Sequence, residues 1–278
     1  MEETEERSQI EENLQVLDNL ARIKHKIVVM SGKGGVGKST VAVNLALTLA
    51  SEGYRVGVMD VDIHGPDVAM LLGVEDERLQ STGDMIVPVR VNENLSAISM
   101  AFLLEDRDTP IVWRGPMKMS AIKQFLGEVA WGDLDYLVID LPPGTGDEPL
   151  SVAQMIPDGA WAVVVTTPQD LALLDSRKAI RFAEALNMNV AGVVENMAGL
   201  ECPHCGESID LFKTGGGEAA ANEMGVNFLG RIPIDPHMVK MGDLGQPYVV
   251  QEPNEPAPRA FHEIAHNLEK RVSEEGGK

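Results

Sequence analysis

The sequence predicts an α/β protein built on a single doubly wound, mainly parallel sheet flanked by helices. Short apolar segments alternate with helical ones along the whole chain, an order typical of parallel sheets whose crossovers are helices. The glycine-rich segment 32–39 also follows the first apolar segment and precedes an Ala- and Leu-rich helix. This strand–loop–helix order is the context in which a phosphate-binding loop opens an α/β sheet.

Each predicted element has a local signal. Apolar runs of a few residues, rich in Val and Ile and ended by polar residues, indicate buried strands. The predicted strands are 27–30, 55–60, one strand with a hairpin within 84–99, 136–140, 161–166, 190–196 and 228–232. The predicted helices cover about 38–52, a segment that follows Met117, 169–187, 215–224 and the C-terminus. One packed face of the C-terminal helix carries Phe261, Ile264, Ala265, Leu268 and Val272.

The chain is expected to divide into two parts. Residues 1–25 are an acidic tail and an amphipathic helix, in which Ile10, Leu14, Leu17 and Ala21 recur at helical spacing. Residues 26–274 are predicted to form one P-loop ATPase domain that contains the Cys-x-x-Cys loop at 202–205. Within it, the Met- and Phe-rich segment 100–119 is either a packed loop or one that faces a partner.

The length, charge and apolar content of the chain exclude some kinds of binding partner. The 278 residues can bury roughly three quarters of their unfolded surface, and the formal charge is −20. Such a charge repels nucleic-acid phosphates and anionic membranes, so neither is expected as a partner. The chain has no signal-peptide pattern and no uncharged run of 18 residues. We therefore expect a cytoplasmic protein.

The segment from Gly32 to Ser39 satisfies G-x-x-x-x-G-K-[ST], the phosphate-binding P-loop. Glycines let backbone N–H groups turn toward an anion, and the N-terminus of the following helix adds partial positive charge. We expect Lys38 to reach the β- and γ-phosphates of ATP and Ser39 to ligate Mg²⁺. The predicted nucleotide-binding residues of this loop are Gly32, Lys33, Gly34, Gly35, Val36, Gly37, Lys38, Ser39 and Thr40.

Carboxylates follow two of the predicted strands. Asp60 and Asp62 end the strand 55–60, at the sheet edge where α/β proteins bind ligands. Asp62 is expected to orient or deprotonate an attacking water and Asp60 to lie behind the metal; the structural alternative is an Asx-turn and helix cap. Asp140 ends an apolar run in the Walker B pattern, which places it near Mg²⁺.

Two more residues near this edge have open roles. Lys33 lies inside the loop, where the residues alone indicate only a spare cation beside the phosphate site or a solvated surface lysine. Asn196 ends the strand 190–196, where its amide would pair with an adenine edge or serve as an ordinary strand-end turn residue.

Cys202 and Cys205 are the chain's two cysteines, and their spacing allows both thiolates to bind one metal. They supply two ligands, whereas zinc sites and iron–sulfur clusters usually take four. Either side chains such as His204 complete the site, or a two-fold axis brings a second pair. A redox-active dithiol and an inert pair are the alternatives.

Taken together, these motifs resemble the Mrp/ApbC-type iron–sulfur cluster carrier ATPases, relatives of the nitrogenase iron protein and of MinD. The resemblance covers about residues 26–270. It rests on the P-loop with its extra lysine, Asp60-x-Asp62-x-x-Gly65-Pro66, Trp113-Arg114-Gly115-Pro116, Asp140 to Asp147, Asn196-Met197 and Cys202-Pro203-x-Cys205. One departure is Asp67, which stands where the family commonly has Ser.

The resemblance implies a deviant Walker A loop, in which Lys33 reaches the nucleotide of the partner subunit in a homodimer. It also implies that ATP and Mg²⁺ bind at the dimer interface. One 4Fe–4S cluster would then be held by Cys202 and Cys205 of both subunits and transferred to apo iron–sulfur proteins.

Two alternatives remain at this point. A ParA/MinD-like positioning ATPase would bind DNA or membrane in a nucleotide-switched manner, which the negative charge and the weakly basic C-terminal helix disfavour. A zinc-bridged dimeric ATPase would serve another client, because thiolate sites accept both Zn²⁺ and iron–sulfur clusters.

Overall fold

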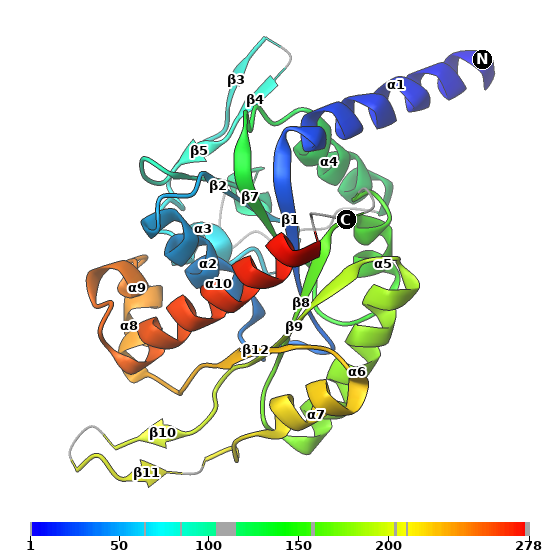
Figure 1. The fold of residues 1–278 in the computed structure, drawn as a ribbon. Helices are drawn as coiled ribbons and strands as arrows, with labels where there is room; N and C mark the ends of the chain where they lie inside the picture. Colours follow the sequence, from blue (N-terminus) through cyan, green and yellow to red (C-terminus); the bar gives the residue numbers. More distant parts are fainter. Residues whose placement is uncertain are drawn as a thin grey trace.

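The structure, a computed structural model, describes residues 2–63, 65–83, 85–103, 115–156, 159–202, 205–209 and 211–275. Its centre is an eight-stranded sheet in the order β12-β9-β8-β1-β7-β2-β6-β5, parallel except for the pairing of β5 with β6 (Figure 1). The strands are β1 (Ile23–Ser31), β2 (Val56–Asp60), β5 (Val89–Arg90), β6 (Leu95–Ser99), β7 (Leu134–Asp140), β8 (Trp161–Thr166), β9 (Asn189–Glu195) and β12 (Phe228–Arg231). The predicted doubly wound fold is confirmed.

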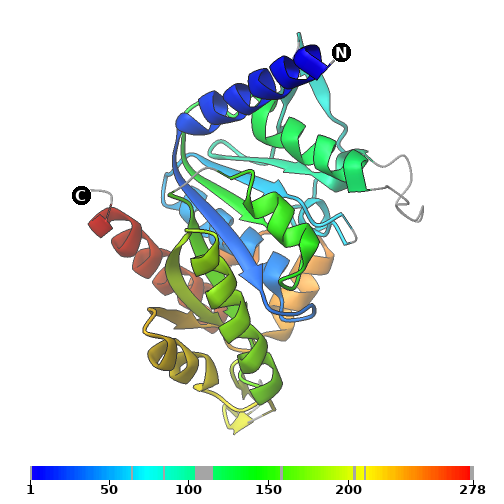
Figure 2. The ribbon, with the colours of Figure 1, turned by 90° about the vertical axis from the view of Figure 1, so that its right-hand side faces the viewer.

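Helices cover both faces of the sheet. One layer contains α2 (Lys38–Ser51), α3 (Val68–Leu71), α8 (Pro236–Asp243), α9 (Tyr248–Gln251) and α10 (Pro256–Glu275). The other contains α1 (Glu2–Ala21), α4 (Gly115–Gly127), α5 (Asp147–Ala153), α6 (Asp170–Ala185) and α7 (Gly216–Met224). Figure 2 shows α4, α5 and α6 in front of the sheet and α10 behind it.

The central strands are apolar on both faces because both are covered. In β1, Ile27 and Val29 pack into the core beneath α2 and α10, whereas Val28 and Met30 pack into the core beneath α4 and α6. All four are at most 1% exposed. Parallel strands buried on both faces read as continuous apolar runs rather than alternating ones, which is the pattern seen in the sequence.

Most predicted elements are present, with a few additions. Two small hairpins, β3 (Gln80–Thr82) with β4 (Met85–Val87) and β10 (Leu200–Glu201) with β11 (Ser208–Ile209), lie outside the main sheet. The 3₁₀ turn η1 (Met100–Leu103) begins the predicted loop, whereas Trp113 and Arg114 lie outside the described residues. Helices α3, α5, α8 and α9 were not predicted.

The C-terminal helix packs as expected. The five predicted apolar residues of α10 are at most 1% exposed and lie against α2, β9 and β12. In the described part of the chain, no helix combines the length and apolar character needed to cross a membrane.

The predicted apolar face of the N-terminal helix is wrong. Leu14 and Leu17 are 54% and 50% exposed, whereas Val16 and Leu20 are buried against α4. The side chain of Ile10 is outside the described part. The rotation of α1 is set by Asn19, whose amide donates to the carbonyl oxygens of Leu126 and Val129 at 2.8 and 3.0 Å at the end of α4. Strand β1 begins at Ile23, before the predicted domain boundary at 26.

Candidate functional site

The P-loop joins β1 to α2 and borders a cavity of about 280 Å³. The cavity is lined by Ser31, Lys33, Gly34, Gly35, Gly37, Lys38, Ser39 and Thr40, and by Asp62, Asp67, Met70, Leu71 and Pro143. Gly37 precedes α2 with φ of 80°, a left-handed conformation that favours glycine. The first-turn N–H groups of α2 therefore start at the cavity, a favourable place for an anion.

Two predicted loop residues do not line the cavity. Val36 is buried at 2% exposure in the core beneath α2. Gly32 lies against α6, where an added Cβ atom would overlap the backbone carbonyl of Asp175. Close backbone approach thus explains the glycine at 32, and any nucleotide contact of these two residues stays a prediction.

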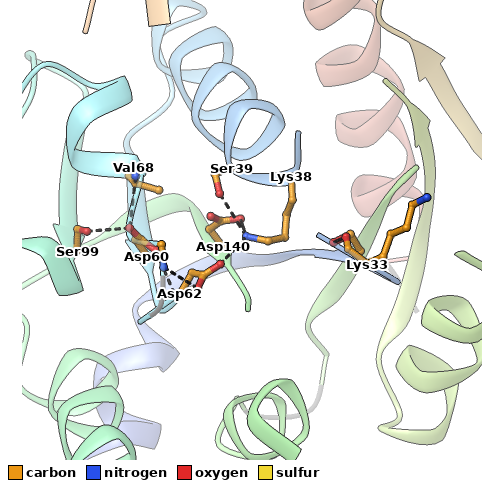
Figure 3. Close-up of polar contacts among 10 residues, drawn as sticks. Lys33, Lys38, Ser39, Asp60, Asp62, Val68, Ser99 and Asp140 are labelled. Carbon is orange, nitrogen blue, oxygen red and sulfur yellow. Dashed lines mark hydrogen bonds and ion pairs between the residues drawn. The ribbon is translucent and has the colours of Figure 1, made fainter. Parts of the chain in front are cut away.

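Lys38 occupies the centre of a buried charged cluster (Figure 3). Its Nζ atom lies 2.7 Å from Asp140 Oδ1, 3.3 Å from Ser39 Oγ and 3.8 Å from Asp62 Oδ2. Strand β7 lies between β1 and β2, so the ends of all three strands deliver these groups to one place. Burial raises the pKa of Asp140, and the charge of Lys38 opposes that rise. The structure therefore brings four predicted site residues together.

Asp60 holds the loop that follows β2. Its carboxylate accepts hydrogen bonds from Ser99 Oγ at 2.8 Å, from the Asp62 backbone N–H at 3.0 Å and from the Val68 backbone N–H at 3.4 Å. Burial, and then the charge of Asp140, hold the pKa of Asp60 well above its usual range. The turn and helix-cap alternative is thus correct for Asp60.

Asp62 makes a turn contact and also faces the cavity. One oxygen, Oδ1, accepts the Gly65 backbone N–H at 3.3 Å, while the other faces Lys38. The residue is 8% exposed and lines the cavity. Its position is compatible with holding a water beside a bound phosphate, and that role stays a prediction.

The residues present fit a magnesium ion. Asp140 Oδ2 is buried and has no hydrogen-bond partner among the described groups, an arrangement that costs free energy. It belongs to the same cluster as the Ser39 hydroxyl, and hydroxyl and carboxylate oxygens are the ligands Mg²⁺ prefers.

Lys33 is separated from Lys38. Figure 3 shows its side chain pointing away from the cluster of Lys38, Asp62 and Asp140. It is half-buried, and its ammonium group forms no hydrogen bond or ion pair with any residue that the structure describes. The two lysines of the loop therefore point in different directions: Lys38 points into the charged cluster, and Lys33 points away from it.

Asn196 contacts the P-loop itself, a role that sequence reasoning missed. Its amide donates to the Val36 carbonyl oxygen at 2.9 Å, and an added Cβ atom on Gly37 would overlap that amide. The residue is 3% exposed. Asn196 thus fixes the loop from β9, and its predicted adenine contact remains untested.

The neighbouring Glu195 was also missed. It is fully buried, accepts the backbone N–H groups of Gly215 and Gly217 at the start of α7, and forms an ion pair with Arg231 at 3.4 Å. The available signal was an acid at the end of an apolar strand with a run of glycines further along the chain. Buried carboxylates require such partners.

The cysteines lie in the turn of the β10–β11 hairpin. The Cys202 backbone N–H donates to the Glu207 carbonyl, and the Gly206 N–H donates to the Cys202 carbonyl, both at 2.9 Å. Cys202 is half-buried, Cys205 is exposed, and neither cysteine forms a disulfide bond. Figure 1 shows β10 and β11 projecting from the body at the lower left, on the side away from α7. His204, the intrachain ligand considered above, lies outside the described residues.

Fold and loop together define a P-loop NTPase, with a Walker A loop, a Walker B aspartate and a doubly wound sheet. A family model named ParA, described as NUBPL iron-transfer P-loop NTPase, matches residues 22–269. The chain belongs to this family.

Relatives and solved structures agree with this placement. The iron–sulfur cluster carrier protein of Methanocaldococcus jannaschii is 49% identical over 240 residues, which cover 86% of this chain and 83% of that protein. The cytosolic Fe-S cluster assembly factor CFD1 of Kluyveromyces lactis is 49% identical over 81% of each chain. The structure of a nucleotide-binding protein from Archaeoglobus fulgidus in complex with ADP matches with a TM-score of 0.77 at 41% identity, covering 90% of this chain and 96% of that one.

Proposed function

We propose that this protein is an ATP-hydrolysing carrier that assembles a 4Fe–4S cluster between two copies of the chain and transfers it to apo-proteins. The observation that carries the proposal is a pair of cysteines without a disulfide bond, Cys205 exposed and Cys202 half-buried, on a hairpin that projects from a P-loop NTPase body. The names of the relatives from Methanocaldococcus jannaschii and Kluyveromyces lactis point to the same cargo.

In the nucleotide site, Lys38 exchanges its contact with Asp140 for the phosphates of ATP. Ser39 and Asp140 would hold Mg²⁺, and the ion would neutralise phosphate charge. Asp62, within ion-pair distance of Lys38, orients the attacking water. Lys33 points away from its own cluster and reaches the nucleotide of the partner subunit.

In the cargo site, each chain offers Cys202 and Cys205. A cluster with four thiolate ligands therefore takes two chains related by a two-fold axis. Because the Cys205 side of the hairpin is exposed, a cluster held there stays within reach of a recipient protein. Recipients are apo iron–sulfur proteins, and the cytosolic relative supports a cytoplasmic setting.

Anaerobic reconstitution tests this proposal. Iron and sulfide assays, with a visible absorption spectrum, should show one cluster per two chains. Cys202→Ala and Cys205→Ala should each lose the cluster while ATP binding, measured by calorimetry, survives. One cluster per monomer, or a cluster that persists in Cys202→Ala, would contradict bridging. Zinc but no cluster after reconstitution would favour the zinc-bridged ATPase instead.

A further inference from the structure

Asp67 lies at the edge of the nucleotide cavity. It is the residue before α3, a position where aspartate usually accepts a hydrogen bond from the first turn of the helix. Here its side chain makes no such bond, and the Val68 N–H is taken by Asp60 instead. The Asp67 carboxylate forms no hydrogen bond or ion pair with any residue in the described ranges.

The surroundings of Asp67 place this free carboxylate at the phosphate site. The residue is exposed toward solvent but also lines the cavity, together with Asp62 and Lys38. Partial burial raises the pKa of Asp67, the charge of Asp62 raises it further, and the charge of Lys38 lowers it. The carboxyl group of Asp67 therefore interacts electrostatically with both Asp62 and Lys38.

Two carboxylates at one wall make the cavity unfavourable for a naked polyanion. Lys38 is the cation inside the cluster, and its single positive charge faces the carboxylates of both Asp140 and Asp62. A nucleotide without metal would bring about three to four negative charges toward Asp62 and Asp67, and like charges at such distances repel strongly when water is partly excluded. A nucleotide that carries Mg²⁺ brings a cation to the same place.

We propose that Asp67 is a specificity-determining residue that makes the site select the magnesium-bound nucleotide over the metal-free one. This inference rests on the proposed nucleotide site and adds a role for a residue outside the P-loop and Walker B motifs. Asp67 opposes free ATP through repulsion and favours the magnesium complex through attraction to its cation.

Calorimetric titration of ATP in Mg²⁺ and in EDTA measures this selectivity as a ratio of affinities. Asp67→Asn keeps the shape of the side chain and removes the charge. We expect the variant to bind metal-free ATP about tenfold more tightly and the magnesium complex a few-fold more weakly, so that the ratio falls by more than tenfold. High salt should reduce the wild-type ratio, because it screens an exposed carboxylate.

A matched control is Asp133→Asn. Asp133 precedes β7, at the opposite end of that strand from Asp140, and its exposed side chain contacts Arg22. This variant should keep the wild-type ratio. Asp67→Ser, checked by circular dichroism, repeats the test with a smaller side chain. Wild-type binding with an unchanged ratio in both Asp67 variants would overturn this inference alone, whereas a wild-type chain that binds ATP in neither buffer would contradict the proposed function itself.

Discussion

The nucleotide cavity and the cysteine hairpin are built in opposite ways. The ends of β1, β2, β7 and β9 all reach the cavity region, where Lys38, Asp60 and Asp140 are nearly or fully buried and joined by short polar contacts. The hairpin has two residues in each strand, and its turn is closed by two backbone hydrogen bonds. One region is built from buried strand ends, and the other is a hairpin of two short strands with the exposed Cys205 in its turn.

The difference shows how rigidity is distributed in this fold. Phosphate recognition needs donors and cations placed before the ligand arrives, because any reordering on binding costs free energy. Thiols that receive and release a cargo need access. The chain provides the first with the buried ends of central sheet strands and the second with an exposed turn.

The largest expected effect comes from a substitution that disrupts the nucleotide cavity and leaves the cysteine hairpin unchanged. Lys38→Ala removes the central cation, and we expect no measurable ATP binding by calorimetry. The buried Asp140 would also lose its partner, which typically costs about 3–5 kcal/mol of unfolding free energy. Cluster reconstitution on the hairpin should still succeed at low temperature. Unchanged ATP affinity in a folded Lys38→Ala variant would disprove the assignment of the cavity.

The next effect separates the two lysines of the loop. Because Lys33 points out of the cluster, Lys33→Ala should bind ATP normally yet lose hydrolysis by roughly 10³-fold or more, as when a residue supplied across an interface is removed. The check is phosphate release by the variant alone and after mixing with Asp62→Asn chains, which should partly restore turnover if Lys33 acts in trans. Normal turnover by Lys33→Ala alone would exclude that role.

A smaller effect compares the rigidity of the two regions directly. Asn196→Ala leaves the buried Val36 carbonyl without its donor, so we expect about 1–3 kcal/mol lower unfolding free energy and weaker ATP binding. Cys205→Ala changes an exposed turn and should lie within about 0.5 kcal/mol of wild type. Urea denaturation of both variants measures the difference. Equal stability losses would mean that the hairpin is as tightly held as the P-loop.

The smallest effect concerns pH. The raised pKa of Asp60 means that the folded state binds more protons than the unfolded state above the usual value of 3.8. The contribution of this group to stability therefore falls as pH rises through that range. Relative to Asp60→Asn, the wild-type unfolding free energy should fall as the pH is raised above the usual pKa of an aspartate toward pH 8. A constant difference between the two proteins across this range would show that Asp60 does not titrate there.

The sequence predicted what is encoded locally. The P-loop, the Walker B aspartate and the central strands are contiguous patterns, and strand ends in a parallel sheet must converge, so Lys38, Asp62 and Asp140 could be placed together in advance. Helix α8 also had a readable start, since Asp235 accepts the N–H groups of His237 and Met238 with Pro236 at the first position, but that signal was overlooked.

What escaped prediction depends on distant partners. Asn196 and the Val36 carbonyl are 160 positions apart, and nothing in either segment specifies the other. The rotation of α1 is decided by hydrogen bonds from Asn19 to the end of α4, more than 100 residues away, so counting apolar residues in the helix gave the wrong face. Such contacts follow from tertiary packing and not from local periodicity.

Glu195 and Asn196, neighbours at the end of β9, connect the P-loop with the start of α7. Successive side chains along a strand point to opposite faces. Asn196 therefore donates a hydrogen bond to the P-loop on one face, and Glu195 accepts one from Gly215 before α7 on the other. The chain leaves this point for the cysteine hairpin and returns to it at Gly215. Both ends of the segment that contains the hairpin therefore meet at Glu195 and Asn196, and Asn196 contacts the P-loop. Any displacement of the Val36 carbonyl would therefore act on Asn196, the neighbour of the residue that holds the start of α7.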